Sequence, residues 1–151
     1  MYMIISPDVR IKSTIRSGSV YLFKEDSFEN CNKKHYFIVL NSNPLSGELL
    51  FLVWAKTLSA KVYLYIDNSS LPLDTFVDIT EQCDWCPNPT VVDCNNLIEK
   101  DISELIDKLK DKKLDMIGLV SVDTLKNLVA GVLKSPLVDR RIKKLLQVDN
   151  Q

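Results

Sequence analysis

The sequence contains no long hydrophobic run and no basic, apolar leader. Its longest apolar stretches, residues 49–55 and 36–40, are far shorter than the roughly 20 residues that a membrane-spanning helix needs. The first seven residues do not have the charged and hydrophobic regions of a secretory signal. We therefore expect a soluble, cytoplasmic protein with no membrane partner.

The sequence also lacks the short motifs of several large enzyme classes. It has no P-loop, G-x-S-x-G, H-E-x-x-H or dinucleotide-binding fingerprint. It has no internal repeat, low-complexity tract or linker. A chain of 151 residues, 46% hydrophobic and 26% charged, can bury one core without disulfides. Residues 1–151 are therefore expected to form a single domain.

Charge of one sign is not in excess overall, but it is unevenly distributed. The net charge is −1, made of +2 over residues 1–73, −8 over residues 74–107 and +5 over residues 108–151. Local field rather than total charge steers a polyanion, so such a chain can still present a basic face. Composition alone therefore neither supports nor excludes a nucleic-acid partner.

The hydrophobic patterning predicts strands first and helices second. Six short segments rich in β-branched and aromatic residues are expected to be strands: residues 18–23, 36–40, 49–55, 62–66, 76–79 and 90–94. The third of these is expected to be buried on both faces. Amphipathic spacing predicts helices over residues 101–113 and 121–134, and residues 116–120 form a short apolar link that could return to the sheet. A last helix is expected to start at Ser135-Pro136. The expected fold class is α+β, with a strand-rich body and helices packed against it.

Two strand ends carry side chains that could do chemistry. His35, the only histidine, follows Lys33 and Lys34 at the start of one strand, and its ordinary pKa suits a general acid or base. Lys56 and Thr57 lie where the buried strand of residues 49–55 ends. The alternative is a surface histidine, solvated lysines and a hydroxyl that satisfies turn backbone.

The cysteines allow a metal-binding alternative. Cys83 and Cys86 form a C-x-x-C, and Cys94 with His35 could complete four zinc ligands. The second pair that most zinc motifs carry is missing, so the other interpretation is ordinary reduced thiols in a proline-rich loop.

The order of segments resembles the PemK/MazF family of toxins. The resemblance rests on residues 18–22, 34–41, 52–59 and 90–95, on Gly118-Leu119 before a helix, and on the terminal helix. It implies a small SH3-like β-barrel of five to seven strands with packed C-terminal helices, which forms a homodimer. It further implies a metal-independent endoribonuclease that cleaves single-stranded RNA without a cofactor and is neutralised by a cognate antitoxin protein.

The resemblance also assigns roles to residues. Where the family has a basic residue and a proline at the mouth of the second strand, this chain has His35 and Tyr36, and the family's Thr or Ser after the third strand matches Thr57. We therefore expect His35, Thr57 and Lys34 to be catalytic. Lys33 and Lys56 are expected to bind RNA.

A non-catalytic binding module on the same barrel is the principal alternative. It would use exposed aromatic side chains to hold a peptide or nucleic acid, and full burial of Trp54 and Tyr63 would count against it. The candidates are Tyr36, Trp54, Tyr63 and Tyr65.

Overall fold

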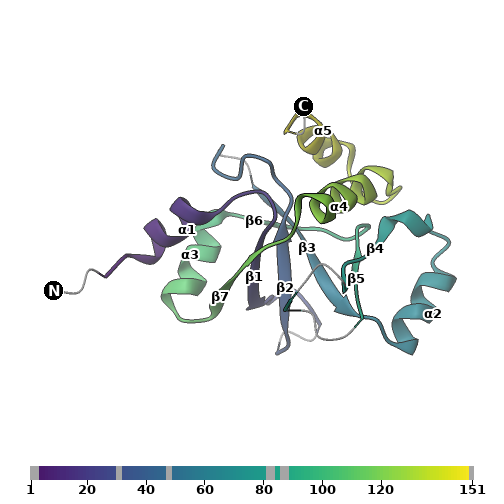
Figure 1. The fold of residues 1–151 in the computed structure, drawn as a ribbon, viewed down its shortest axis with the longest axis horizontal. Helices are drawn as coiled ribbons and strands as arrows, with labels where there is room; N and C mark the ends of the chain where they lie inside the picture. Colours follow the sequence, from purple (N-terminus) through teal and green to yellow (C-terminus); the bar gives the residue numbers. More distant parts are fainter. Residues whose placement is uncertain (1–3, 30–31, 47–48, 81–83, 86–88, 150–151) are drawn as a thin grey trace.

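A computed structural model describes residues 4–29, 32–46, 49–80, 84–85 and 89–149 of the chain (Figure 1). Helices and strands follow one another in the order α1 (Pro7–Thr14), β1 (Ser19–Lys24), β2 (Lys34–Val39), β3 (Leu50–Thr57), α2 (Ala60–Asn68), the 3₁₀ helix η1 (Leu73–Thr75), β4 (Phe76–Asp78), β5 (Thr90–Asp93), β6 (Ile98–Lys100), α3 (Ile102–Lys110), β7 (Leu114–Leu119), α4 (Val122–Lys134) and α5 (Arg140–Asp149). The expected α+β class is confirmed.

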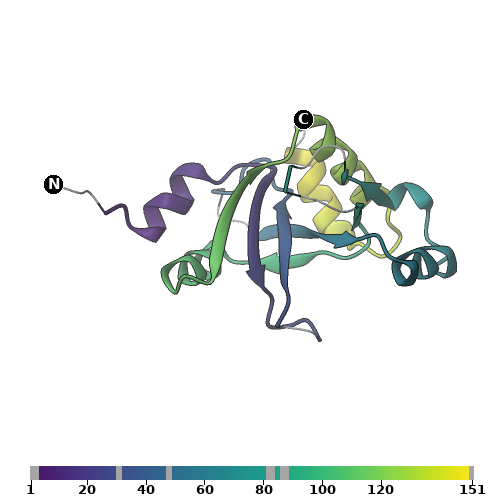
Figure 2. The same ribbon diagram turned by 60° about the horizontal axis from the view of Figure 1, so that its bottom comes forward.

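The strands form one antiparallel sheet in the order β4-β5-β3-β2-β1-β7, with β6 also pairing with β3. β3 is the shared strand, because its first half pairs with β2 and β6 and its last half pairs with β5. Figure 2 shows β3 running across the direction of β1 and β2. Among the described strands the path ends at β4 and β7, so the sheet is bent but does not close into a barrel.

Helices cover both faces of the sheet, and each face has its own core. On one face α1 and α3 pack on alternate residues of β1, β2 and β3, whereas α4 and α5 pack on the other (Figure 1). Leu50, Leu52 and Phe37 belong to the first core, and Phe51, Val53 and Ile38 to the second. All six side chains are essentially inaccessible to solvent. Burial of β3 on both faces is therefore confirmed, and each such side chain contributes about 1.5–3 kcal/mol.

Local sequence signals explain where the expected helices begin. Asp101 accepts a hydrogen bond from Ser103 N at the start of α3, and Ser121 accepts one from Thr124 N at the start of α4. The helices predicted over residues 101–113 and 121–134 are confirmed. The apolar link of residues 116–120 contributes most of β7, which pairs with β1.

Two sequence-based predictions are wrong. Residues 62–66 form the middle of helix α2, not a strand, because the Ser59 side chain caps the helix and the less exposed Val62 and Ile66 are one turn apart. Ser135 does not start the last helix. It ends α4 by donating its N–H to Val132 O at 3.1 Å, and α5 begins only at Arg140.

The patterning also missed α1 and β6. Ser6 and Pro7 provide the N-cap and first residue of α1, and Ile11 is its buried anchor. β6 has only three residues, too few for an alternation to be visible. Within the described ranges, none of the helices is long and apolar enough to cross a bilayer.

Candidate functional site

The candidate site lies where β2 and β3 separate. These strands pair directly only from Phe37 opposite Trp54 to Val39 opposite Leu52. Before Phe37, β2 pairs with β1, and after Trp54, β3 pairs with β5 instead. The two strand ends therefore diverge, and a fork opens between them.

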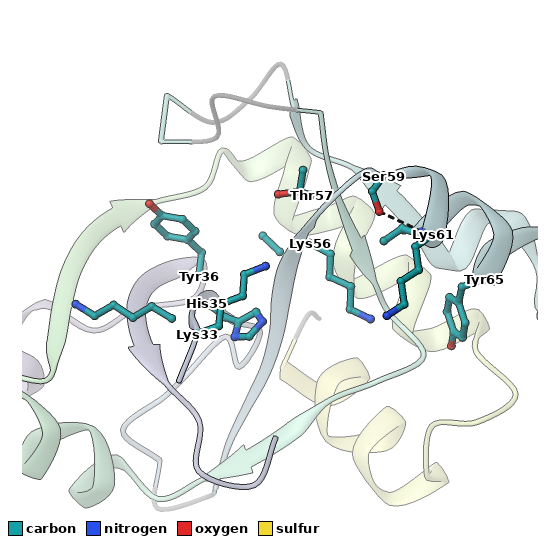
Figure 3. A pocket seen from close by; sticks show the side chains of 11 residues that line it. Lys33, His35, Tyr36, Lys56, Thr57, Ser59, Lys61 and Tyr65 are labelled. Carbon is teal, nitrogen blue, oxygen red and sulfur yellow. Dashed lines mark hydrogen bonds between the residues drawn. The ribbon is translucent and has the colours of Figure 1, made fainter. Parts of the chain in front are cut away.

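A cavity of about 590 Å³ occupies this fork (Figure 3). The start of β2 forms one wall, the end of β3 forms another, and the first turns of α2 form the third. Its lining consists of Lys33, Lys34, His35, Tyr36, Ala55, Lys56, Thr57, Ser59, Lys61, Val62 and Tyr65. The third wall is set by Ser59, whose Oγ accepts a 3.3 Å hydrogen bond from Val62 N and starts α2 directly after the strand.

The alternation of each strand divides the lining into two groups. His35 shares its face with Phe37, and Lys56 shares the same face with Trp54. Thr57 follows Ala55 on the opposite face, which packs in the core under α4 and α5. In Figure 3, Thr57 lies in the upper part of the cavity and His35 in the lower part. All the predicted site residues thus line one cavity, but the imidazole and the Thr57 hydroxyl enter it from opposite faces of the sheet.

His35 sits in an aromatic environment. Its ring meets Phe28 edge-on, with the centroids 5.2 Å apart, and Phe37 lies 6.1 Å away. Nδ1 is buried and has no partner of ordinary hydrogen-bond geometry among the described residues. Burial, and then the charge of Lys33, lower the pKa of His35 below its usual 6.5; a backbone contact with Lys33 partly offsets this, and Lys56 lowers it further. The imidazole is therefore neutral at physiological pH and able to accept a proton.

Positive charge dominates the cavity. Lys33, Lys34, Lys56 and Lys61 line it, and no Asp or Glu does so within the described parts of the chain. The ammonium group of Lys56 lies 5.6 Å from the ring centroids of both Trp54 and Tyr65. In Figure 3 the amino groups of Lys56 and Lys61 point into the same part of the cavity. Such an arrangement suits an anionic group such as a phosphate.

Tyr65 links the α2 wall to a buried polar network. Its hydroxyl donates to Asp93 Oδ2 at 3.3 Å, and Asp93 Oδ1 accepts from both nitrogens of Asn95. Burial, followed by the charge of Asp93, raises the pKa of Tyr65. Tyr65 is therefore a neutral hydrogen-bond donor that holds the side of the cavity next to Lys56.

Sequence reasoning missed Lys61 and named Tyr65 only as an aromatic candidate of a binding module, because it predicted a strand over residues 62–66. A signal was present in Ser59, a preferred N-cap residue three positions before Val62. Treating Ser59 as a helix start would have placed one turn of α2 beside the end of β3.

Zinc binding cannot be assigned to the cysteines. Cys83 and Cys86 lie outside the described residues. Cys94 is fully buried, and burial, followed by the charge of Asp93, raises the pKa of its thiol to about 12. Across the described ranges, no three His, Cys, Asp or Glu side chains group as metal ligands do.

The aromatic candidates differ in exposure. Tyr36 packs on Trp85 with a centroid distance of 4.6 Å, and Trp54 is only partly buried against Phe28. Tyr63 is 56% exposed. The burial that would have counted against an aromatic binding surface is therefore not observed.

Two comparisons of the sequence with known proteins give no match. No model of a protein family matches the sequence, and no curated protein matches it. The functional argument for this chain therefore rests on the fork and its side chains.

Proposed function

We propose that the chain is a metal-independent endoribonuclease of the PemK/MazF-like toxin type, which cleaves single-stranded RNA in the fork between β2 and β3. One observation carries the proposal: a neutral imidazole shares a cavity with four lysines and with no described carboxylate. The imidazole supplies a base, the lysines bind the anionic phosphate and Thr57 supplies a proton donor, which are the three requirements for cleaving RNA without a metal ion.

The reaction uses the ribose 2′-hydroxyl as nucleophile. His35 takes the proton of this hydroxyl, whose oxygen attacks the adjacent phosphorus as the bond from phosphorus to the 5′-oxygen breaks. The products are a 2′,3′-cyclic phosphate and a 5′-hydroxyl, whose oxygen takes its proton from the Thr57 hydroxyl while that group regains one from water. Lys56, on the same face as His35, holds the non-bridging oxygens of the reacting phosphate.

The other predicted residues act around this centre. Lys34 and Lys33 bind phosphate from the β2 wall, and Lys56 serves both RNA binding and charge stabilisation. Thr57 enters from the opposite face, so its O–H faces the leaving 5′-oxygen on the far side of the reacting phosphate. Lys61 and Tyr65 complete the site from α2.

The fold and the partners belong to the same proposal. The sheet is bent and antiparallel, and β3 pairs with β2 and β6 along its first half and with β5 along its last half. This arrangement supports a relationship to the SH3-like barrel. The apolar side chains of Tyr63, Leu64 and Leu73 are 56–73% exposed beside the α2 wall, which supports contact with an antitoxin protein or with a second protomer of a homodimer.

An RNA cleavage assay in the presence of a chelator tests the proposal. Purified protein is mixed with single-stranded RNA, and we expect cleavage that persists with chelator and falls about 10²–10⁴-fold in His35→Ala. Lys126→Gln, an exposed α4 charge outside the cavity, is the matched control and should cleave normally. Intact RNA at high protein concentration, or full activity of His35→Ala, contradicts the proposal.

Aromatic exposure favours a second candidate, a non-catalytic module that binds RNA or peptide. Trp54 and Tyr65 flank the Lys56 ammonium group, and Tyr65 is 45% exposed, so a base or aromatic side chain could stack there. RNA that binds without being cleaved, with weaker binding by Tyr65→Ala, would select this function.

A further inference from the structure

A second basic cavity adjoins the fork. It has a volume of about 320 Å³ and lies between the facing ends of β1 and β2 and the C-terminal end of α3. Five lysines and one acid line it: Lys24, Asp26, Lys34, Lys108, Lys112 and Lys113. Lys34 lines both cavities, so the two adjoin at this residue.

The lysines from α3 are held by the structure of the helix end. Lys112 adopts a left-handed conformation with φ of 60°, and the N–H of Lys113 donates to Lys108 O at 2.8 Å, which terminates the helix. The Lys108 ammonium group donates to Lys24 O at 3.1 Å and lies 5.5 Å from the ring centroid of Phe23. The backbone positions of Lys112 and Lys113 are thereby fixed beside the cavity, and the Lys108 ammonium group is held there, which lowers the entropy that it loses on binding an anion.

Acidic groups do not neutralise this cavity. Asp26 is the only carboxylate in its described lining. Lys34 approaches Asp115 at 4.0 Å, but both side chains are at least half exposed, so this ion pair is weak. The helix dipole favours lysine near the C-terminal end of α3. It does not determine which of these lysines line the cavity, because Lys110 in the same turn does not. The chain is nearly neutral overall, so the gathering of charge is local.

We propose that this second cavity binds backbone phosphates of the same RNA strand, beyond the phosphate cleaved in the fork. The inference rests on the proposed function and specifies its substrate as a single strand of several nucleotides that runs from the fork past Lys34 to the end of α3. RNA is the polyanion that the fork already selects, and phosphate contacts of this kind position a strand without reading its sequence.

The test measures RNA binding by the full chain as salt is varied. The probes are single-stranded 2′-O-methyl RNAs of about 4 and about 16 nucleotides, the range that one small domain covers. These probes keep the phosphates but lack the attacking 2′-hydroxyl, so the protein binds without cleaving. The variant Lys112→Gln/Lys113→Gln removes two charges from the second cavity. The control Lys110→Gln/Lys126→Gln removes two exposed charges outside it.

The proposal predicts that the cavity variant weakens binding of the long probe. The plot of log affinity against log salt has a negative slope, and its magnitude should decrease by about 1.4. Each lost phosphate contact contributes about 0.7 for single strands. Binding of the short probe should not change, and the control pair should behave as the unmodified protein. An unchanged slope, an equal loss with the short probe or an equal loss in the control pair would each overturn the proposal.

The outcomes separate this inference from the proposed function. If Lys112→Gln/Lys113→Gln binds the long probe normally while His35→Ala abolishes cleavage of ordinary RNA, the extended strand path is wrong and the endoribonuclease remains. If the cavity variant loses affinity as expected but the unmodified protein cleaves nothing, the path remains and the endoribonuclease is wrong. Failure of the protein to bind either probe removes the strand path, and failure also to cleave ordinary RNA removes both.

Discussion

Breaking the ion pair between Glu25 and Lys100 should be among the most costly single changes in this protein. Lys100 Nζ lies 2.8 Å from Glu25 Oε2 and 3.0 Å from Glu104 Oε2. The side chain of Glu25 is 2% exposed and that of Lys100 is 13% exposed. This cluster ties the end of β1, which carries Lys24 of the second basic cavity, to β6 and α3.

The change Lys100→Met removes the cation and leaves Glu25 buried without a charged partner. Removing one partner of a buried pair costs about 3–5 kcal/mol, whereas total stability is about 5–15 kcal/mol. The pH dependence has a defined sign. Burial lowers the pKa of Lys100, but the hydrogen bonds to Glu25 and Glu104 and the charges of these two carboxylates together outweigh burial and raise it. The stabilisation is therefore complete below the unfolded value of 10.5 and is lost as pH rises through the folded-state pKa.

Urea unfolding of a matched pair of variants measures this cost. The matched variant Lys134→Met breaks the ion pair of Lys134 with Asp74. Its Nζ–Oδ2 distance of 2.7 Å is similar, but the two side chains are 57% and 55% exposed. We expect a much smaller loss for this pair, because solvent screens the interaction of two exposed charges. The double change Glu25→Met/Lys100→Met should recover most of the stability that Lys100→Met loses. If Lys100→Met costs no more than Lys134→Met, the buried-charge reasoning is refuted.

Three further predictions address single contacts. Lys33→Gln should raise the pKa of His35, so the acidic limb of the pH–rate profile for RNA cleavage should move to higher pH; an unmoved limb contradicts this. Gly131→Ala should cost about 1–3 kcal/mol in urea unfolding because its Cβ would lie 2.9 Å from the buried Cys94 Sγ, and Cys94→Ala should relieve much of that loss. Asn41→Ala should lower the free energy of unfolding by about 1–3 kcal/mol, since Asn41 Oδ1 accepts a buried hydrogen bond from Phe51 N of β3 at 2.7 Å. An unchanged stability in thermal unfolding would argue against this.

The sequence predicted the elements whose signals are local. Continuous burial in the second half of β2 and the first half of β3 is visible because hydrophobic residues fill both faces of a sheet covered by two helical layers. It failed at residues 62–66, where the β propensity of tyrosine and isoleucine competes with the cap at Ser59. This segment contributes no fully buried residue, so packing in the core does not decide its structure. The cap and the helical spacing therefore determine it.

The candidate site was predictable as a set of residues but not as a geometry. His35, Lys56 and Thr57 were found because polar side chains at strand ends stand out beside buried strands. Their arrangement depends on β3 leaving β2 after Trp54 to pair with β5, which is more than 30 residues away along the chain. That switch of partners opens the fork between the two strands, and no local pattern encodes it. Strand alternation then places His35 and Thr57 on opposite faces.

The chemistry of the RNA ends is the most direct measurement of the central claim. Single-stranded RNA is incubated with the protein and a chelator, and the fragments are analysed by mass spectrometry. Attack by the 2′-hydroxyl in the fork predicts fragments that end in a 2′,3′-cyclic phosphate and begin with a 5′-hydroxyl. Uncut RNA, or fragments with 3′-hydroxyl and 5′-phosphate ends, would contradict the account.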